Sequence, residues 1–235
     1  MLEISYILVF ISLVIGIYVT IRKALLQSGS AKVNQFTILY VSGMICWIVY
    51  LYLISYNGYI YDKSMPPRFP IFVFIPAIIF MLYFFYTRKN SKLFEYIPNS
   101  WAIYYQSFRI IMEVIILMTF QSELIPIQAT FQGYNFEILF ALTAPIIGYF
   151  TFVKPIFSKR IAIIWNIIGI LFLFVVVGIM VSSYFLPEMW GSENELIDIR
   201  FTQFPLILLP AFMVPSAIFV HIFSIMQIRK GANKV

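Results

Sequence analysis

Charged residues and cysteine are scarce in this chain of 235 residues. Asp, Glu, Lys and Arg together make up 11% of it, against 62% hydrophobic residues and a mean hydropathy of +0.92. Soluble domains carry roughly 25% charged residues, so a soluble globule is excluded. The single cysteine, Cys46, leaves no disulfide or thiolate metal cluster within one chain. We interpret it as a small packing residue.

Catalytic and cofactor signatures are missing as well. The single histidine, His221, is too little for a polyhistidine zinc site, and no HExxH, GxSxG or phosphate-loop motif occurs. The last apolar run, residues 204–227, offers no lysine for a Schiff base, which disfavours a microbial-rhodopsin photopigment. The sequence therefore predicts no metal and no cofactor, although a haem held by one histidine stays open.

Long apolar runs dominate the chain. About 20 helical residues, rising ~1.5 Å each, cross the ~30 Å hydrocarbon layer. Only helices or closed barrels satisfy their backbone there, and these runs are continuously apolar rather than alternating, which excludes a barrel. We predict an all-α polytopic membrane protein, a single transmembrane domain over residues 1–235. Its seven helices are expected at residues 4–21, 36–56, 70–86, 101–121, 136–153, 161–184 and 204–227.

Basic residues are divided unevenly between the two ends of these helices. One set of ends carries Arg22, Lys23, Lys32, Arg88, Lys89, Lys92, Lys154, Lys159, Arg160, Arg229, Lys230 and Lys234, and the other carries Lys63, Arg68 and Arg200. Because Lys and Arg are retained on the cytoplasmic side, we predict an outside N-terminus and a cytoplasmic C-terminus. Anionic lipid headgroups then explain the net charge of +6 better than nucleic acid does.

Two apolar stretches have similar sequences. RFPIFVFIPAIIF begins at Arg68, RFTQFPLILLPAFMVPSAIF begins at Arg200, and both contain Phe-Pro and then Pro-Ala. We interpret them as parts of a parallel repeat of three helices, a linker helix and three more, related by an axis along the membrane normal. In topology and proline use alone, this arrangement is similar to SWEET-type transporters. No SWEET signature motif occurs, and rhodopsin-like proteins share the seven-helix topology.

Prolines interrupt three of the predicted helices. Pro76, Pro145, Pro210 and Pro215 each remove one backbone hydrogen bond and free the carbonyl four residues before. Such a carbonyl needs a partner at membrane depth. Two interpretations stay open: hinges that move beside a solvated cavity, and static kinks satisfied by a neighbouring helix.

Charged residues inside the fourth predicted helix are the strongest indication of a site. In YYQSFRIIMEVIILMTFQSE, Arg109 and Glu113 are four residues apart and share one helix face, so we expect them to pair. An unpaired charge at the bilayer centre costs at least ~3 kcal/mol. Either the pair only fixes this helix against its neighbours, or Glu113 carries a coupling proton and Arg109 binds an anionic or polar group.

Other polar residues are expected at a similar depth. Trp165 and Asn166 begin the sixth predicted helix, and His221 lies in the inner half of the seventh. If these faces converge with Arg109, they form an inner pocket with Glu113 at its floor. The alternative for His221 is a hydrogen-bonded packing residue.

A second set of polar residues is predicted at the outer ends of the helices. This outer-mouth cluster comprises Arg68, Glu123, Asn135, Glu137 and Arg200. For Asn135 and Glu137 we favour capping of the fifth helix, whose free N–H groups attract acceptors and carboxylates.

The stretch QSFRIIMEVIILMTFQSELIPIQATFQGYNFEILFALTAP, residues 106–145, resembles uncharacterised multi-spanning membrane proteins of bacteria. The resemblance implies a multi-pass protein of the bacterial inner membrane and transfers no activity.

We predict a carrier of a small polar or anionic solute that works by alternating access, in preference to an enzyme. Its expected partners are the lipid bilayer, a small-molecule ligand and, for a homo-oligomer, further copies of itself. One alternative is an intramembrane enzyme or a haem-type cofactor subunit that uses His221. The other is a receptor or a membrane assembly factor.

Overall fold

The structure is a computed structural model that describes residues 1–56, 58–62, 66–88 and 91–232. Within these residues the secondary structure is helical, with no strand. Three residues used to predict the orientation, Lys63, Lys89 and Lys234, lie outside the described part.

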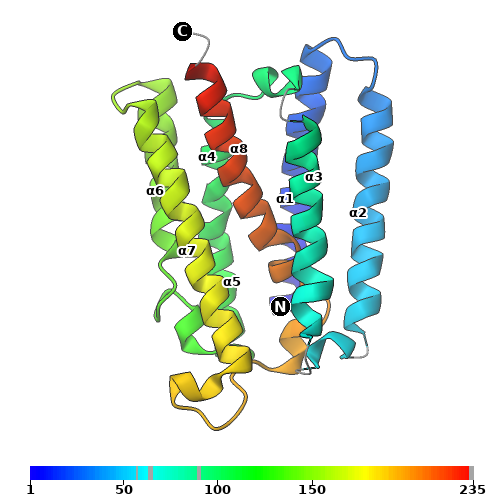
Figure 1. Cartoon of the computed structure of the whole chain (residues 1–235), viewed down its shortest axis with the longest axis vertical. Coiled ribbons are helices and arrows are strands. Elements are labelled where there is room, and N and C mark those ends of the chain that lie inside the picture. The colour runs from blue at the N-terminus through cyan, green and yellow to red at the C-terminus, as the bar shows by residue number, and fades with distance from the viewer. Residues whose placement is uncertain (57, 63–65, 89–90, 233–235) are drawn as a thin grey trace. The chain divides into compact units, whose positions relative to one another are not determined.

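The α-helices of the described residues are labelled in Figure 1. They are α1 (Leu2–Gln27), α2 (Val33–Ser55), α3 (Ile75–Arg88), α4 (Trp101–Tyr105), α5 (Arg109–Gln121), α6 (Glu137–Gly148), α7 (Lys159–Phe185) and α8 (Val214–Ala232). Short 3-10 turns connect them: η1 (Tyr59–Tyr61), η3 (Lys92–Tyr96), η4 (Gln106–Phe108), η5 (Ile127–Ala129), η7 (Pro187–Trp190) and η8 (Ile199–Thr202).

Three π-helical turns lengthen the helices that contain prolines. They are η2 (Pro70–Phe74) before α3, η6 (Tyr149–Val153) after α6 and η9 (Leu209–Met213) before α8. Because π-helical turns are rare and mostly occur singly, their presence in these helices indicates that proline disturbs the regular hydrogen-bond ladder here.

Joined in this way, six helices within the described residues are long and apolar enough to cross a membrane. They are Leu2–Gln27, Val33–Ser55, Pro70–Arg88, Trp101–Gln121, Lys159–Phe185 and Leu209–Lys230. The seventh predicted span, Glu137–Val153, forms a shorter apolar helix. The all-helical, multi-pass prediction is confirmed at this level, whereas seven spans, their orientation and the repeat stay predictions.

The start of the last span differs from its predicted position. We expected it to begin near residue 204, but the helix begins at Leu209 because residues 204–207 form turns. Pro210 then lies in the first turn, where a helix tolerates a residue without an N–H group. The span at residues 101–121 is helical throughout, with the 3-10 turn η4 directly before Arg109.

The chain divides into two compact units. Unit 1 comprises Met1, Glu3–Pro98 and Thr202–Pro215, and unit 2 comprises Leu2, Asn99–Phe201 and Ser216–Val235. The boundary near the C-terminus falls between Pro215 and Ser216 inside α8. A single transmembrane domain over the whole chain stays a prediction.

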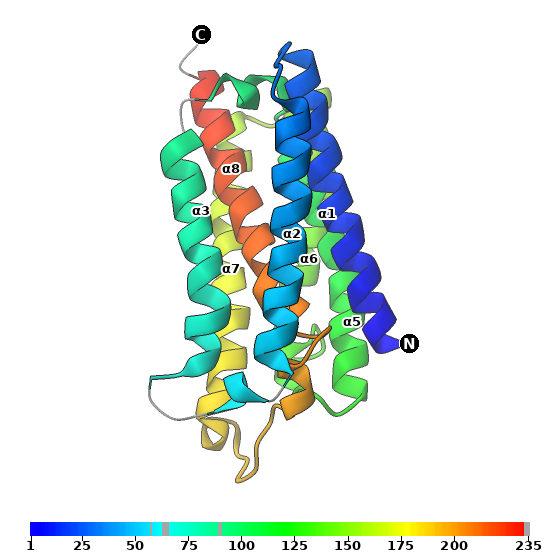
Figure 2. The ribbon, with the colours of Figure 1, turned by 90° about the vertical axis from the view of Figure 1, so that its right-hand side faces the viewer.

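Neutral contacts hold the helices of unit 1 together. The Tyr40 hydroxyl of α2 donates to the Val14 carbonyl of α1 at 2.8 Å, and the Tyr18 and Thr37 hydroxyls are 3.1 Å apart. The two helices lie side by side in Figure 2. Cys46, which we expected to be a packing residue, is exposed on α2.

The proline kink of unit 1 has a partner for its freed carbonyl. Pro76 cannot donate to the carbonyl of Phe72, and the Tyr50 hydroxyl of α2 donates to that oxygen at 2.8 Å. Of the two interpretations of this proline, the structure therefore favours a kink satisfied by a neighbouring helix.

In unit 2, α6 packs against α4, α5 and α7 (Figure 1). Small residues at buried positions of α6, Ala141, Ala144 and Gly148, allow this close approach. Ala144 also belongs to an apolar cluster with Ile103, Ala162, Trp165 and Ile228. These contacts bring the polar faces of α5, α6, α7 and α8 together.

Candidate functional site

A buried polar network crosses unit 2. Its ionisable members are Arg109 and Glu113 on α5, Glu137 on α6 and His221 on α8, and none is more than 4% exposed. Asn166 on α7 is fully buried beside them. Four helices therefore contribute to one polar site in an otherwise apolar unit.

Arg109 forms its ion pair with Glu137 across the interface between α5 and α6. No salt bridge joins Arg109 to Glu113 among the described residues, although their opposite charges attract each other. The reason is the direction of the side chain. Residues four apart share a helix face, but Arg109 reaches across that face to the neighbouring helix, where Glu137 is buried and has Arg109 as its ion-pair partner among the described residues.

His221 receives the second contact of Arg109. Nη1 of Arg109 lies 3.1 Å from Nε2 of His221. A guanidinium only donates, so Nε2 must be the accepting, unprotonated nitrogen. Nδ1 then carries the proton and donates to Oδ1 of Asn166 at 2.8 Å. The contacts thus specify a neutral imidazole with one tautomer.

Asn166 continues the chain of hydrogen bonds on α7. Its Nδ2 donates to the Ala162 carbonyl at 2.7 Å and to the Ser224 hydroxyl of α8 at 3.1 Å. The structure thus brings Arg109, Asn166 and His221 into one connected chain.

Trp165, which was expected beside these residues, lies against the imidazole of His221 with 5.5 Å between ring centroids. Its Nε1 donates to the Thr143 hydroxyl of α6 at 3.0 Å. Trp165 therefore packs on the network without belonging to its hydrogen bonds.

Gly169, one turn beyond Trp165 on α7, makes room for the imidazole. A Cβ atom at this position would lie 2.5 Å from Cε1 and 2.7 Å from Nε2 of His221. These distances are far below van der Waals contact, so only glycine fits while His221 keeps its two hydrogen bonds.

Asn135 binds Glu113 at the other end of the network. Its Nδ2 donates to the Glu113 carboxylate oxygens at 2.8 and 3.1 Å and to the Ala129 carbonyl at 3.1 Å. Its Oδ1 accepts from the backbone N–H of Glu137 at 3.0 Å, which satisfies the first turn of α6 as we expected.

The prediction of one outer-mouth cluster is wrong for Asn135 and Glu137. Both are buried, with 1% and 2% of their surface exposed, and both bind residues of α5. The physical reason is that the loop at residues 122–136 folds back on itself, so the residues at the start of α6 face Glu113 and Arg109 rather than solvent.

The remaining members of that predicted cluster have local partners. Arg200 makes a two-point contact with Asp198 at 2.9 Å for each bond, and this guanidinium holds the pKa of Asp198 below its usual range. In unit 1, Arg68 pairs with Asp62 at 2.8 Å and lies over the Tyr59 ring. Glu123 ends the helix before the loop with a φ of 59°, a left-handed conformation unusual for its type.

Gln106 and Ser224 belong to the site and were missed. Gln106 is fully buried in η4, and its Nε2 donates to the Ala217 carbonyl of α8 at 3.0 Å. Its Oε1 has no hydrogen-bond partner among the described residues. The spacing of Gln106 and Arg109, three residues apart on one helix face, was the available indication.

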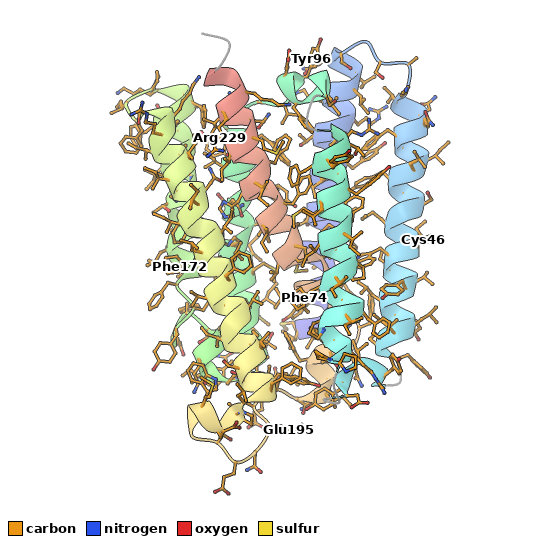
Figure 3. The ribbon with its side chains drawn as sticks, in the orientation of Figure 1. Cys46, Phe74, Tyr96, Phe172, Glu195 and Arg229 are labelled. Carbon is orange, nitrogen blue, oxygen red and sulfur yellow. The ribbon has the colours of Figure 1, made fainter. Side chains whose placement is uncertain are left out.

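The two ends of unit 2 differ in charge. Figure 3 places Glu195 in the loop beyond α7, and Arg229 lies near the opposite end of the unit on α8.

Among the described residues, no three His, Cys, Asp or Glu side chains gather closely enough to hold a metal ion.

Comparisons with protein-family models, with curated protein sequences and with solved structures found no match to this chain. Its function is therefore argued from the site alone.

Proposed function

We propose that this protein is a proton-coupled carrier of a small anionic or polar solute in the bacterial inner membrane. The observation that carries the proposal is the charge composition of the buried network. Glu113 and Glu137 face a single guanidinium, that of Arg109, and the hydrogen bonds of His221 specify a neutral ring.

Two ionised carboxylates and one guanidinium leave one negative charge in excess. Burying an unpaired carboxylate in an apolar medium is costly enough that such a group tends to take up a proton instead. Glu137 already has Arg109 as a counter-ion. Glu113 is the remaining carboxylate, and we assign the coupling proton to it.

The hydrogen bonds of Glu113 support this assignment. Asn135 is the side chain that donates to it, and the two hydrogens of that amide are shared among three acceptors, two on Glu113 and one on Ala129. A neutral amide compensates a carboxylate less than a guanidinium does. Glu113 is thus less well compensated than Glu137.

Arg109 is the group that would bind the solute. Its guanidinium is planar and matches carboxylates and phosphates, and Glu137 occupies it as an internal counter-ion. An anionic solute must therefore compete with Glu137. Asn166 and Trp165 contribute a polar and an aromatic surface beside the same site.

Irregular turns in the helices of the site support movement. The 3-10 turn η4 directly precedes Arg109, and α6 contains Pro145 followed by the π-helical turn η6. Interruptions of this kind inside helices often mark functional positions. The interface between α5 and α6, which carries the ion pair, is where we expect the carrier to change shape.

The cofactor alternative is less well supported. A haem iron would need a ring nitrogen of His221, but Nε2 accepts from Arg109 and Nδ1 binds Asn166. Coordination would break one of these bonds and leave a buried polar group without a hydrogen-bond partner, which costs about 1–3 kcal/mol.

The test begins with native mass spectrometry of the purified protein to identify a retained solute. Uptake of that solute and of protons is then measured in proteoliposomes with a radiolabel and a trapped pH dye. Glu113→Gln should abolish proton-driven uptake, whereas Glu193→Gln, which alters an exposed loop carboxylate, should behave as the wild type. Unchanged proton-driven flux in Glu113→Gln would remove Glu113 from the mechanism. Copurification of a protein partner without any flux would favour the receptor or assembly factor.

A further inference from the structure

The loop between α5 and α6, residues 122–136, is held in place by its own backbone hydrogen bonds. Thr130 is their centre: its N–H donates to Ile127, and its carbonyl accepts from Gly133 at 2.9 Å and from Asn135 at 3.2 Å. The N–H of Tyr134 donates to the Gln128 carbonyl at 3.1 Å. The backbone of Asn135 is therefore fixed by the loop before its side chain makes any contact.

Gly133 shows how tightly this loop is folded. A Cβ atom at this position would overlap the carbonyl oxygen of Ile127 and lie 2.6 Å from Cα of Gln128. Both are backbone atoms and cannot swing away as a side chain could. The folded loop thus fixes the position of the Asn135 side chain inside the unit.

The amide of Asn135 is oriented by its surroundings. Nδ2 faces three acceptors, the two oxygens of Glu113 and the carbonyl of Ala129, and Oδ1 faces the backbone N–H of Glu137. Turned by 180°, Oδ1 would face three acceptors and Nδ2 would face a donor. This arrangement is therefore most favourable while both oxygens of Glu113 accept, because a protonated carboxyl keeps one accepting oxygen and adds a donor.

Protonation of Glu113 changes that balance. The protonated carboxyl has an O–H to donate, and the Asn135 amide can accept it only by turning Oδ1 toward Glu113. The turn would remove the acceptor of the Glu137 N–H, in the first turn of the helix that holds Glu137 against Arg109. The one amide is thus bound to both carboxylate residues of the site.

We propose that Asn135 is a positioning residue that couples proton binding at Glu113 to the Arg109–Glu137 ion pair through the start of α6. The proposal rests on the proposed function in one respect, that Glu113 takes up a proton. When the proton binds, Asn135 turns, the first turn of α6 loosens and Arg109 is released toward an anionic solute.

Asn135, rather than a charged neighbour of Glu113, connects Glu113 to the start of α6. Arg109 lies one turn before Glu113 on α5, Glu137 faces it from α6, and His221 on α8 is neutral and bound to Arg109. On α7, Asn166 binds Nδ1 of His221 and does not titrate. Among these neighbours, Asn135 is the one whose hydrogen bonds join Glu113 to the backbone of α6.

The experiment combines two measurements on the full chain in lipid nanodiscs across a range of pH. Infrared difference spectroscopy follows the protonated carboxyl band of Glu113, assigned by its loss in Glu113→Gln. Hydrogen exchange with mass spectrometry follows the backbone amide of Glu137. The same peptide in Glu113→Gln supplies the intrinsic pH dependence of exchange. In the wild type we expect exchange at Glu137 to rise roughly three- to tenfold as the carboxyl band appears, the size of one lost hydrogen bond.

Asn135→Asp separates the two contacts of this side chain. A carboxylate still accepts from the Glu137 N–H and remains a good helix cap, so the fold is retained, but it has no N–H to donate to Glu113 or to the Ala129 carbonyl. We expect a protonated carboxyl at neutral pH, because two facing carboxylates share one proton, and exchange at Glu137 that no longer follows pH. Gln132→Ala, an exposed change in the same loop, is the control and should match the wild type.

Two results would overturn the coupling. One is a Glu113 carboxyl band that titrates in the wild type while exchange at Glu137 stays constant. The other is an Asn135→Asp variant with the pH response of the wild type. The absence of any Glu113 band over the whole pH range is a different failure, because it removes the proton from the proposed function itself.

Discussion

The two units of this chain use different chemistry to hold apolar helices together. In unit 1 the contacts between helices are tyrosine hydroxyls on backbone carbonyls, such as Tyr40 on Val14 and Tyr50 on Phe72, together with aromatic pairs. In unit 2 an ion pair, a histidine and two asparagines are buried between the helices. Both units consist mainly of long apolar helices.

This difference indicates where function is concentrated. A neutral hydrogen bond to a carbonyl satisfies the backbone and needs no further partner. A buried charge is costly unless it is paired and is retained mainly at functional positions. Unit 1 is therefore interpreted as the scaffold and unit 2 as the site, and the following variants test that distinction.

The largest effect is expected from removing Arg109. Arg109→Met should lower the free energy of unfolding by about 3–5 kcal/mol, because Glu137 is left buried without its counter-ion. Arg109→Met combined with Glu137→Met should recover most of this loss, since an apolar pair replaces the ion pair. The measurement is reversible unfolding in mixed micelles with increasing sodium dodecyl sulfate.

Arg68→Met is the matched change in unit 1. Arg68 and its partner Asp62 are 34% and 37% exposed in their side chains, and exposed pairs contribute at most about 1 kcal/mol. Equal losses for Arg109→Met and Arg68→Met would contradict the proposed difference between the units.

A smaller effect is expected at Gly169. Gly169→Ala should cost about 1–3 kcal/mol, because the added Cβ displaces the His221 imidazole from its two partners. Gly178→Ala on the same helix is the control, since a Cβ there meets nothing within 4 Å. That change should be neutral or stabilising by up to about 1 kcal/mol. The same unfolding measurement tests both variants. A Gly169→Ala variant with the unfolding free energy of the wild type would show that His221 is free to shift.

The hydrogen bond of Tyr50 at the proline kink of unit 1 should contribute little to the free energy of unfolding. Tyr50→Phe leaves the Phe72 carbonyl without its hydroxyl donor, and such hydrogen bonds within membranes contribute about 0.6 kcal/mol on average. Pro76→Ala restores a backbone N–H for the same carbonyl. Tyr50→Phe should therefore cost less in the Pro76→Ala background than alone. A double-mutant cycle tests this, with the exposed Tyr52→Phe as the control, and an additive cycle would contradict the shared acceptor.

The smallest effect is expected at the exposed pair of Asp198 and Arg200. The guanidinium lowers the pKa of Asp198 in the folded protein, so its stabilising contribution is present above the ordinary pKa of aspartate and is lost as pH falls through the lowered value. Asp198→Asn should reduce the midpoint temperature slightly at neutral pH, and the difference from the wild type should vanish in acid. A difference that grows in acid would have the wrong sign.

Sequence reasoning identified the elements of the site better than their contacts. Arg109, Glu113, Asn166 and His221 stand out because polar groups are rare in apolar helices. The structure joins Arg109, His221 and Asn166 in one chain of hydrogen bonds, whereas Glu113 is bound by Asn135. The partner of Arg109 was missed because side-chain pairing across a helix interface depends on the rotation and depth of the neighbouring helix. Neither the rotation nor the depth of a neighbouring helix can be predicted from the spacing of residues along one helix.

Asn135 illustrates the same limit. Its position before the fifth predicted span indicated a capping role, and its Oδ1 does satisfy the first turn of α6. That its Nδ2 reaches Glu113 depends on how the loop at residues 122–136 folds back.

The sequence by itself determined that this is an all-helical, multi-pass chain, because the length and apolarity of each run fix helix formation wherever water is absent. The tertiary structure decided which polar groups meet: Glu137 with Arg109, Asn135 with Glu113, and Gly169 with His221. Apolar surfaces are nearly interchangeable and tolerate many helix arrangements, whereas a buried hydrogen bond requires its two atoms within about 3 Å of each other. Only the packed helices set such distances.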